Sequence, residues 1–437
     1  MSFNQTLKTA AHGVSALARK KAMAVAVGAA MVGSAALVAG TPVKVAHAAD
    51  IEKPASPAKI VFETSWPNSI TLWRPDKYFV DLVNTLANGH VDIQYNEGGT
   101  FSSSVQMFDD VQSGSIDMGS DWPSYWEGRN TAFSLTTSVP MIFTPNDYMT
   151  WYWQRGGYEL INELYAKYGL RWFPHSITSP ESGQRTNKAI NTLEDYKGLR
   201  LRQCGRNQSR LLDGMGASAV FTPGGEVYAA LDRGVLDGAE FSVPEVDYKM
   251  GLSEVTKYVV KPGWHQPGPI SGIMINKDVY DSLDDYTKFV MKQAAQSTML
   301  WSFTYFEQTS GHYTREFAKK GTEVTRLDDE VLAKVVSLVE DQILADAKEN
   351  PDHAKISFSM YDYLVSMKEW RKYQKPFTQG YEWDSMEDTH AKLEQIAKDH
   401  GVYDETMEVI NDVIARNEKQ AFWTPGSEYV NNPVSTK

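Results

Sequence analysis

The stretch that decides the fold runs from Lys197 to Gly268 and contains KGLRLRQCGR, FTPGGEVYAALDRGVLDGAEF and KPGWHQPGP. KGLRLR predicts a short strand, NQSRLLDGMGAS a helix, AVFTPGG a strand with a turn, and EVYAALDRG a second helix. This alternation is typical of an α/β layer, where ligand-binding loops follow the carboxyl ends of the strands. An arginine at a strand end, an acid beside a phenylalanine and a Trp-His-Gln loop together predict a pocket for a small carboxylate.

Residues 59–120 show the same alternation nearer the N-terminus. KIVFET, HVDIQYN and SIDMGS predict strands, and helical spacing of apolar residues separates them. VQMFDDVQSGSIDMG and VYAALDRGVLDGA share a pattern of helix, glycine and short strand, in which Gly114 and Gly234 are expected to end the helices. Two such units predict two lobes whose loops face each other. The alternative is a chance similarity of two helix–glycine–strand units.

The first 48 residues predict a cleavable secretory signal peptide. Residues 1–21 carry basic but no acidic side chains, residues 22–40 are small and apolar, and Ala46 and Ala48 fit a small-x-small cleavage signal. A paired arginine is absent, which favours the general secretory route over the twin-arginine route. Cleavage after Ala48 would release the protein into the periplasm. The alternative is a retained membrane anchor, because the apolar run approaches spanning length.

The composition disfavours some classes of binding partner. The 437 residues include 43 basic and 55 acidic side chains, and the basic leader makes the exported part more acidic than the net charge of −12. Such a charge disfavours nucleic acid and anionic membranes, although a local arginine can still attract an anion into a cleft. Cys204 is the only cysteine, so no internal disulfide can form. A small residue filling a strand is favoured there over a reactive thiol.

The chain resembles the solute-binding (DctP-type) receptors of tripartite ATP-independent periplasmic (TRAP) transporters. Within them it is most similar to the branch that binds 2-oxo acids and related small carboxylates. The resemblance covers about residues 60–310 and rests on SWPNS, VDIQYNEGGTFSSSVQMFDDVQSGSIDMG, PSYWEGRNTAF, KGLRLRQCG, FTPGGEVYAALDRGVLDGAEF, KYVVKPGWHQPGP and IMINKDVYDSL. KGLRLR combined with PGGEVYAALDRGVLDGAE is specific, whereas each piece alone is weak.

The expected fold is an α/β, two-lobed clamshell of the periplasmic-binding-protein type. Leu283 to Gly321 has the composition of one long helix, and the resemblance implies that it crosses both lobes. The expected segments are a signal peptide (1–48), lobe 1 (49–180, with about 268–300 returning to it), lobe 2 (181–267, with about 322–350), the inter-lobe helix (283–321) and a C-terminal helical extension (351–437). The extension leaves two alternatives open: it pairs two copies as a homodimer, or it packs on the back of lobe 2.

The resemblance implies a ligand clamp and a cation site. Arg202 matches the arginine that grips the ligand carboxylate, and Arg offers the two parallel N–H groups that Lys lacks. Glu240 and the carbonyl of Phe241 match oxygen ligands of a cation, Na⁺ or Ca²⁺, that bridges to the ligand. Gln266 stands where the family has a second acid, which leaves a monovalent ion, weaker binding or no ion as alternatives. Gln184 is carried over from a family glutamine, although the spacing differs.

Aromatic side chains are expected to wall the pocket. Tyr125 and Trp126 lie in the loop PSYW, and Trp264 lies in the opposite loop; core packing is the alternative for the first two. Weaker candidates are Trp66, Trp122 and, as a polar contact, Asp247. Arg200 and Arg206 are expected on the solvated face.

The expected function is that of a periplasmic receptor that captures a small 2-oxo or 2-hydroxy monocarboxylate and delivers it to TRAP permease subunits in the membrane. The chain shows no nucleophile motif, zinc-binding HExxH motif or phosphate loop, so an exported hydrolase or lyase is the weaker alternative. A purely sensory periplasmic binding protein is a second alternative.

Overall fold

The computed structural model describes residues 52–374 and residues 391, 394, 395, 398, 399, 401, 403, 404, 406–408 and 411. The predicted signal peptide and most of the predicted extension beyond residue 374 lie outside the described residues. The chain divides into two units, Met1–Glu52 and Lys53–Lys437, and everything below concerns the second unit.

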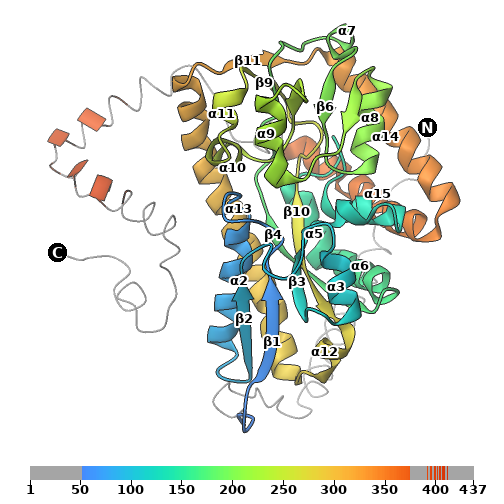
Figure 1. Ribbon diagram of the computed structural model, residues 1–437, viewed down its shortest axis with the longest axis vertical. Helices are drawn as coiled ribbons and strands as arrows, with labels where there is room; N and C mark the ends of the chain where they lie inside the picture. Colours follow the sequence, from blue (N-terminus) through green and yellow to red (C-terminus); the bar gives the residue numbers. More distant parts are fainter. Residues whose placement is uncertain are drawn as a thin grey trace, which may run out of the picture. The chain divides into compact units, whose positions relative to one another are not determined.

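Two β-sheets organise the described part of the chain (Figure 1). The first sheet has the order β2-β1-β3-β10-β4, in which β1 pairs parallel to β2 and β3, and β10 pairs antiparallel to β3 and β4. Its strands are β1 (Ala58–Glu63), β2 (Val91–Asn96), β3 (Met118–Asp121), β4 (Leu170–Ile177) and β10 (Ile270–Asn276). The returning strand β10 therefore lies inside the sheet, between two strands that precede it by about a hundred residues or more.

We call the first sheet with its helices the first lobe. The helices are α2 (Trp73–Leu86), α3 (Met107–Ser113), α4 (Ser134–Thr137), α5 (Pro145–Gln154), α6 (Gly157–Ala166) and α12 (Lys277–Ser282). Apolar residues of α2 at helical spacing pack on alternating apolar residues of β1, as with Phe79 and Val83 against Ile60 and Phe62. Gly114 ends α3 in the left-handed conformation, as the sequence predicts.

The second sheet has the order β11-β9-β5-β8-β6-β7. Its strands are β5 (Gln184–Thr186), β6 (Arg200–Arg202), β7 (Ser218–Val220), β8 (Gly238–Ala239), β9 (Tyr258–Lys261) and β11 (Glu323–Arg326). With α7 (Leu193–Tyr196), α8 (Arg206–Gly214), α9 (Val227–Asp232), α10 (Pro244–Lys249), α11 (Leu252–Val255) and α14 (Asp329–Glu349), it forms the second lobe. The parallel strands β7, β6 and β8 all end at the same edge, which faces the loops of the first lobe.

A single helix, α13 (Asp285–Lys319), runs along both lobes (Figure 1). It begins where Asp284 accepts a hydrogen bond from the backbone N–H of Thr287, and its 35 residues span about 52 Å at 1.5 Å per residue. It packs on β4 and α2 of the first lobe and on α10 of the second. Ser302 Oγ lies within hydrogen-bond distance of both the N–H and the carbonyl of Ile177, which anchors the middle of the helix to the first sheet.

The last fully described helix, α15 (Pro351–Gln374), packs on α14 of the second lobe and on the first lobe. Its buried residues Ile356, Met360 and Tyr363 recur at helical spacing and face α6 and the turn at 131–133. The Tyr363 hydroxyl also donates to Asp147 at 3.1 Å. Helix α15 therefore touches both lobes, and the packing of the extension on the back of lobe 2 stays a prediction. The pairing of two copies stays a prediction.

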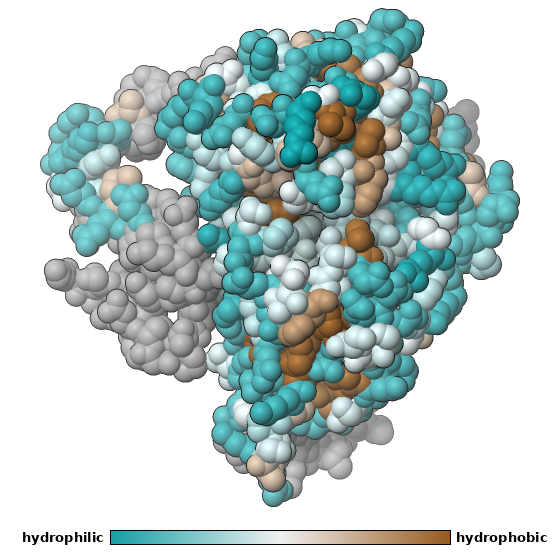
Figure 2. All heavy atoms as spheres, viewed as in Figure 1, coloured by the Kyte–Doolittle hydropathy of each residue, from teal (hydrophilic) through white to brown (hydrophobic). Residues whose placement is uncertain are grey.

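The surface seen in Figure 2 is mostly polar, with separate apolar patches. Among the described residues, no helix combines the length and apolar character needed to cross a membrane.

Candidate functional site

Arg202 ends β6 and is only 2% exposed. Its Nε donates to the carbonyl of Thr222 at 3.1 Å, and its Nη1 donates to the carbonyl and to Oε1 of Glu240 at 2.8 and 2.7 Å. Among the described residues Nη2 has no hydrogen-bond partner, and the side chain lines a pocket. The guanidinium is thus held in one orientation with an edge turned to the pocket, as the capture of a carboxylate requires.

Glu240 follows β8 directly and is completely buried. Its Oε1 accepts hydrogen bonds from Arg202 and from the backbone N–H of Cys204 at 2.5 Å, whereas Oε2 has no partner among the described residues. Burial raises the pKa of this carboxyl group to about 7, even though the Arg202 charge opposes the shift. A buried carboxylate oxygen without a partner is costly and indicates a missing cation or donor.

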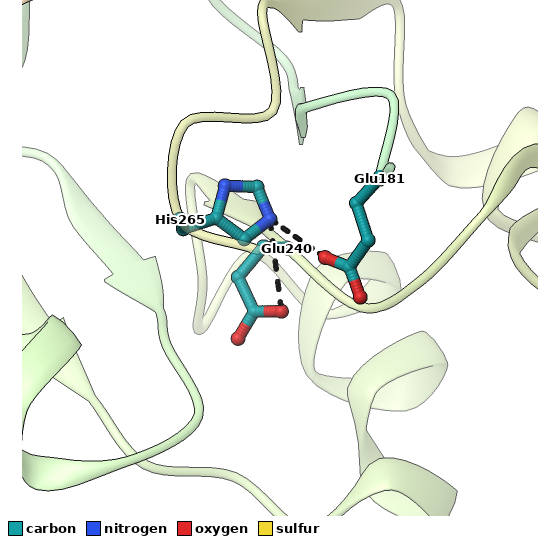
Figure 3. Close-up of side chains that lie close together, drawn as sticks. All are labelled: Glu181, Glu240 and His265. Atoms are coloured by element: carbon teal, nitrogen blue, oxygen red, sulfur yellow. Dashed lines mark hydrogen bonds and ion pairs between the residues drawn. The ribbon is translucent and has the colours of Figure 1, made fainter. Parts of the chain in front are cut away.

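Glu181 and His265 complete a cluster with Glu240 (Figure 3). His265 Nε2 lies 2.8 Å from Glu181 Oε2 and 4.0 Å from Glu240 Oε2, and all three side chains are buried. Burial lowers the pKa of His265 to about 3, so the imidazole is neutral. Burial, Glu240 and Asp247 raise the pKa of Glu181 well above its usual range.

Two glycines allow the loops that carry this cluster to meet. The backbone N–H of Glu181 donates to the carbonyl of Gln266 at 3.1 Å. A Cβ at Gly263 would lie 2.0 Å from the Glu181 carbonyl oxygen, and a Cβ at Gly183 would lie 1.9 Å from that of Val260. Gly183 also has a φ of +133°, which residues with a side chain rarely adopt. This contact brings Gln266 beside Glu181, and Gln266 Oε1 is buried without a partner among the described residues.

The walls of the pocket are largely apolar. Trp66 and Trp122 meet edge to face at 6.2 Å, and the Arg202 guanidinium lies 5.2 Å from the centre of the Phe241 ring. Both lobes contribute lining residues, namely Trp66, Leu72, Trp122, Tyr125, Thr178, Glu181, Arg202, Cys204, Phe241, Ser242, Gln266 and Pro269. Among these described residues Arg202 is the one cation, so the pocket offers a single strong binding group for an anion.

Three residues that the sequence pointed to lie outside this lining. Trp126 turns into the core of the first lobe, where its indole Nε1 donates to Asp121 at 2.5 Å. Trp264 is buried in the same apolar cluster. Gln184 starts β5, and its Oε1 accepts from the Tyr196 hydroxyl at 3.2 Å. In contrast, the structure brings Arg202, Glu240, Phe241, Gln266 and Tyr125 together around one pocket or its buried edge.

The structure also shows where the weaker candidate Asp247, the flanking arginines and the cysteine lie. Asp247 is buried and accepts a hydrogen bond from Arg185 Nε at 3.0 Å, so it is a structural partner rather than a lining residue. Arg200 and Arg206 are exposed, and Arg200 pairs with Asp237. Cys204 is buried in the pocket wall, and burial raises the pKa of its thiol to about 12, which makes it unreactive in this arrangement.

Sequence reasoning missed Glu181 as a member of the site. The residue lies in the connection ITSPESGQR, in which the sequence predicts only Gln184 as a site residue. The available signal is the acid itself, which lies two residues before Gly183 in the connection that enters the second sheet. His265 was recognised only as part of a polar loop, because nothing local shows that this loop touches residue 181.

The oxygen atoms of this cluster suit a hard cation. Glu181, Glu240 and Gln266 supply side-chain oxygens, of which Glu240 Oε2 and Gln266 Oε1 have no other partner among the described residues. Ca²⁺ and Na⁺ prefer such carboxylate and amide oxygens, and a bound cation would supply the positive charge that two adjacent buried carboxylates lack. His265, neutral and bonded to Glu181, would orient that carboxylate.

The chain is similar to known periplasmic solute-binding proteins. A monocarboxylate 2-oxoacid-binding periplasmic protein of Nostoc sp. is 28% identical over 269 residues, covering 62% of this chain and 74% of that protein. Among solved structures, a TRAP periplasmic solute-binding protein of Pseudoalteromonas atlantica with bound sodium and pyruvate has a TM-score of 0.68 at 25% identity, covering 75% of this chain and 100% of that one.

A second solved structure, the TRAP periplasmic solute-binding protein of Colwellia psychrerythraea with bound calcium and pyruvate, gives a TM-score of 0.68 at 26% identity, over 74% of this chain and 100% of that one. The family and these neighbours are solute-binding receptors and not enzymes. The model of the family "Bacterial extracellular solute-binding protein, family 7" (DctP) matches residues 62–349, so the chain belongs to this family of receptors.

Proposed function

We propose that this protein is the periplasmic receptor of a TRAP-type transporter and captures a small 2-oxo or 2-hydroxy monocarboxylate together with a cation. The observation that carries the proposal is the buried Arg202, whose guanidinium edge meets a largely buried pocket beside two carboxylates. Arg202 takes the ligand carboxylate through parallel N–H···O bonds. The 2-oxo or 2-hydroxyl oxygen then lies toward the oxygens of the acidic cluster.

The charges around the pocket explain why an anion needs a companion here. Arg202 carries one positive charge, whereas Glu181 and Glu240 carry two negative charges when both are ionised. An added carboxylate would then be repelled unless a cation joins it. Two carboxylates, the Gln266 amide oxygen and the Phe241 carbonyl make a plausible oxygen set for Ca²⁺ or Na⁺. The pyruvate complexes of the two solved relatives, one with sodium and one with calcium, support this assignment.

The position of the second acid differs from what the resemblance implied, but the chemistry is kept. An acid was expected at 266 and an amide in the preceding connection, whereas this chain has Gln266 and, beside it, Glu181. An exchange of acid and amide between two touching loops leaves the number of carboxylates around the cation unchanged. Glu181 therefore supports the cation site that Gln266 alone left open.

The apolar walls favour monocarboxylates over dicarboxylates. A second ligand carboxylate would face Trp66, Trp122 or Phe241 without a cationic partner among the described lining residues. Burying an unpaired carboxylate costs of the order of several kcal/mol. The 2-oxoacid-binding relative in Nostoc supports the same ligand class.

The proposed setting is the periplasm, reached through cleavage of the leader after Ala48. Lobe 1 (49–180 with about 268–300) and lobe 2 (181–267 with about 322–350) would close on the ligand, and the closed receptor would dock on membrane permease subunits. Membership of an extracellular solute-binding family supports this setting.

Isothermal titration of the exported chain tests the proposal. The protein is stripped with a chelator in sodium-free buffer and titrated with pyruvate, 2-oxobutyrate and 4-methyl-2-oxopentanoate, and with malonate and 2-oxoglutarate as dicarboxylate controls. We expect 2-oxo monocarboxylates to bind only after Ca²⁺ or Na⁺ is restored. Equal affinity with and without cation would refute the cation site, and absence of binding by every acid would refute the carboxylate receptor.

A pair of exchanged variants tests the acid–amide exchange. Glu181→Gln should weaken the cation affinity at least about tenfold because one carboxylate ligand is lost. Adding Gln266→Glu to that variant should restore the affinity, since the carboxylate returns on the neighbouring loop. Glu159→Gln, an exposed position, is the matched control. No rescue by the double variant would show that Glu181 acts otherwise than as a cation ligand.

A further inference from the structure

The pocket lies between the two lobes and its lining is largely buried, so separation of the lobes would open it for ligand exchange. Most of its lining side chains, from both lobes, are less than a tenth exposed, for example Trp66 at 4%, Trp122 at 8% and Arg202 at 2%. Contacts that cross between the lobes therefore decide how long a captured ligand stays. Among these contacts the buried charged groups matter most, because their rupture changes the opening equilibrium most.

Glu127 makes the first such contact, from the first lobe to the second. It is 3% exposed, and its Oε2 accepts a hydrogen bond from the backbone N–H of Asn207 at 2.9 Å, in the first turn of α8. A carboxylate at a helix N-terminus is favoured by the helix dipole. Gly205 makes room for it, because a Cβ there would lie 2.8 Å from Glu127 Oε1, and its φ is +89°. The helix α8 directly follows the loop that carries Arg202.

Glu245 makes the second contact, from the second lobe to the first. It lies in the first turn of α10 and is completely buried. Its Oε2 accepts from the Thr71 hydroxyl of the first lobe at 2.6 Å, and its Oε1 accepts from the Tyr305 hydroxyl of α13 at 3.2 Å. Lys249 lies 2.8 Å from the same carboxylate and balances its charge. Thr71 precedes Leu72, which lines the pocket.

We infer that Glu127 and Glu245 are positioning residues that hold the lobes closed and thereby set the residence time of the ligand. The two contacts are reciprocal: one acid reaches from the first lobe to the backbone of the second, and the other accepts from the first lobe while fixed in the second. Thr71, the partner of Glu245, precedes the lining residue Leu72, and α8, the partner of Glu127, follows the loop that carries Arg202. Neither touches the proposed ligand or cation, so each acts only through closure. The inference rests on the proposed capture of a ligand.

Two measurements on the full exported chain test this role. Stopped-flow dissociation of pyruvate in saturating Ca²⁺ gives the ligand off-rate. The reaction of Cys204 with a thiol reagent in the ligand-free protein reports opening, because this single thiol is buried in the pocket wall. The second measurement needs no ligand, so a protein that fails to bind pyruvate would refute the proposed function without deciding the role of the two acids.

Thr71→Val is the main variant, because it removes the donor across the lobes and leaves Glu245 bonded to Tyr305 and paired with Lys249. A lost charge-assisted hydrogen bond should raise the off-rate and the thiol reactivity each by about tenfold or more. Thr71→Ser keeps the hydroxyl and should behave as the parent. Thr150→Val, whose hydroxyl donates to the Asn146 carbonyl of its own helix, controls for the loss of a hydroxyl elsewhere in the first lobe.

Glu127→Gln tests the other contact, since it keeps an acceptor oxygen but removes the charge at the α8 N-terminus. We expect a faster off-rate with an on-rate that does not fall. Unchanged off-rate and unchanged thiol reactivity in folded Thr71→Val would overturn the inference. A slower on-rate with an unchanged off-rate would also overturn it, because that pattern means a distorted pocket. If Glu127→Gln does not fold, the Thr71 variants decide alone.

Discussion

Replacing Arg202 by lysine separates the shape of the guanidinium from its charge. The arginine reaches the Thr222 carbonyl, the Glu240 carbonyl and the Glu240 carboxylate at 3.1, 2.8 and 2.7 Å and still borders the pocket. A lysine ammonium keeps the ion pair with Glu240 but presents no planar fork. Losing one charge-assisted hydrogen bond to the ligand costs about 1.5–3 kcal/mol, which corresponds to a dissociation constant about 10 to 150 times larger.

Arg202→Ala differs from Arg202→Lys because it also removes the positive charge. It leaves the buried Glu240 without its cation, so the free energy of unfolding should fall by about 3–5 kcal/mol in addition to the loss of ligand affinity. Urea unfolding of the ligand-free protein measures that loss, and titration calorimetry of the folded variants measures affinity. Arg202→Lys that binds pyruvate within about twofold of the parent would refute the bidentate clamp. Arg202→Ala with unchanged stability would refute the structural role of the Arg202–Glu240 pair.

Three further outcomes follow from the surroundings of the site. Trp126→Phe removes the donor to Asp121 and should lower the free energy of unfolding by about 1–3 kcal/mol in urea, with unchanged ligand affinity; a large loss of affinity would contradict its place in the core. Burial raises the pKa of Asp121 from 3.8 to about 6, so the unfolded chain ionises first, and this group's contribution to stability is lost as pH rises between these values. Asp121→Asn, compared with the parent over that range by urea unfolding, should gain relative stability with rising pH; a constant difference would contradict the raised pKa. Gly263→Ala places a Cβ 2.0 Å from the Glu181 carbonyl oxygen and should weaken cation binding in calorimetry, whereas an unchanged affinity would mean that the loops separate without consequence.

Most of the fold could be predicted because its signals are local. Apolar spacing, glycines and turn residues marked β1, α2, β6, α8 and the long α13 within a few residues. What decides the place of α15 is not local: its stripe of Ile356, Met360 and Tyr363 predicts a buried face but not which surface covers it. Sequence alone therefore could not show that this helix contacts α14 of the second lobe as well as the first lobe.

The site residues likewise fall into those whose proximity could be predicted and those that are brought together by tertiary contacts. Arg202 and Glu240 end neighbouring parallel strands, β6 and β8, so their proximity follows from a simple topological rule. Glu181 meets Gln266 only because β5 and β9 pair antiparallel and two glycines permit a close approach, and no pattern in the sequence encodes that pairing. Tyr125 and Trp126 are adjacent aromatics, and only the short 3-10 turn decides that one faces the pocket and the other the core.

The strand order has a consequence for how the chain is made. Strand β10 completes the middle of the first sheet, and it leaves the ribosome after the whole of residues 184–261. Strand β11 completes the edge of the second sheet and is synthesised later still. Neither sheet can be finished before β10 and β11 have been synthesised, because pairing of such distant segments must follow their synthesis. If the predicted leader directs export, this late completion keeps the chain unfolded while it passes through a translocation channel.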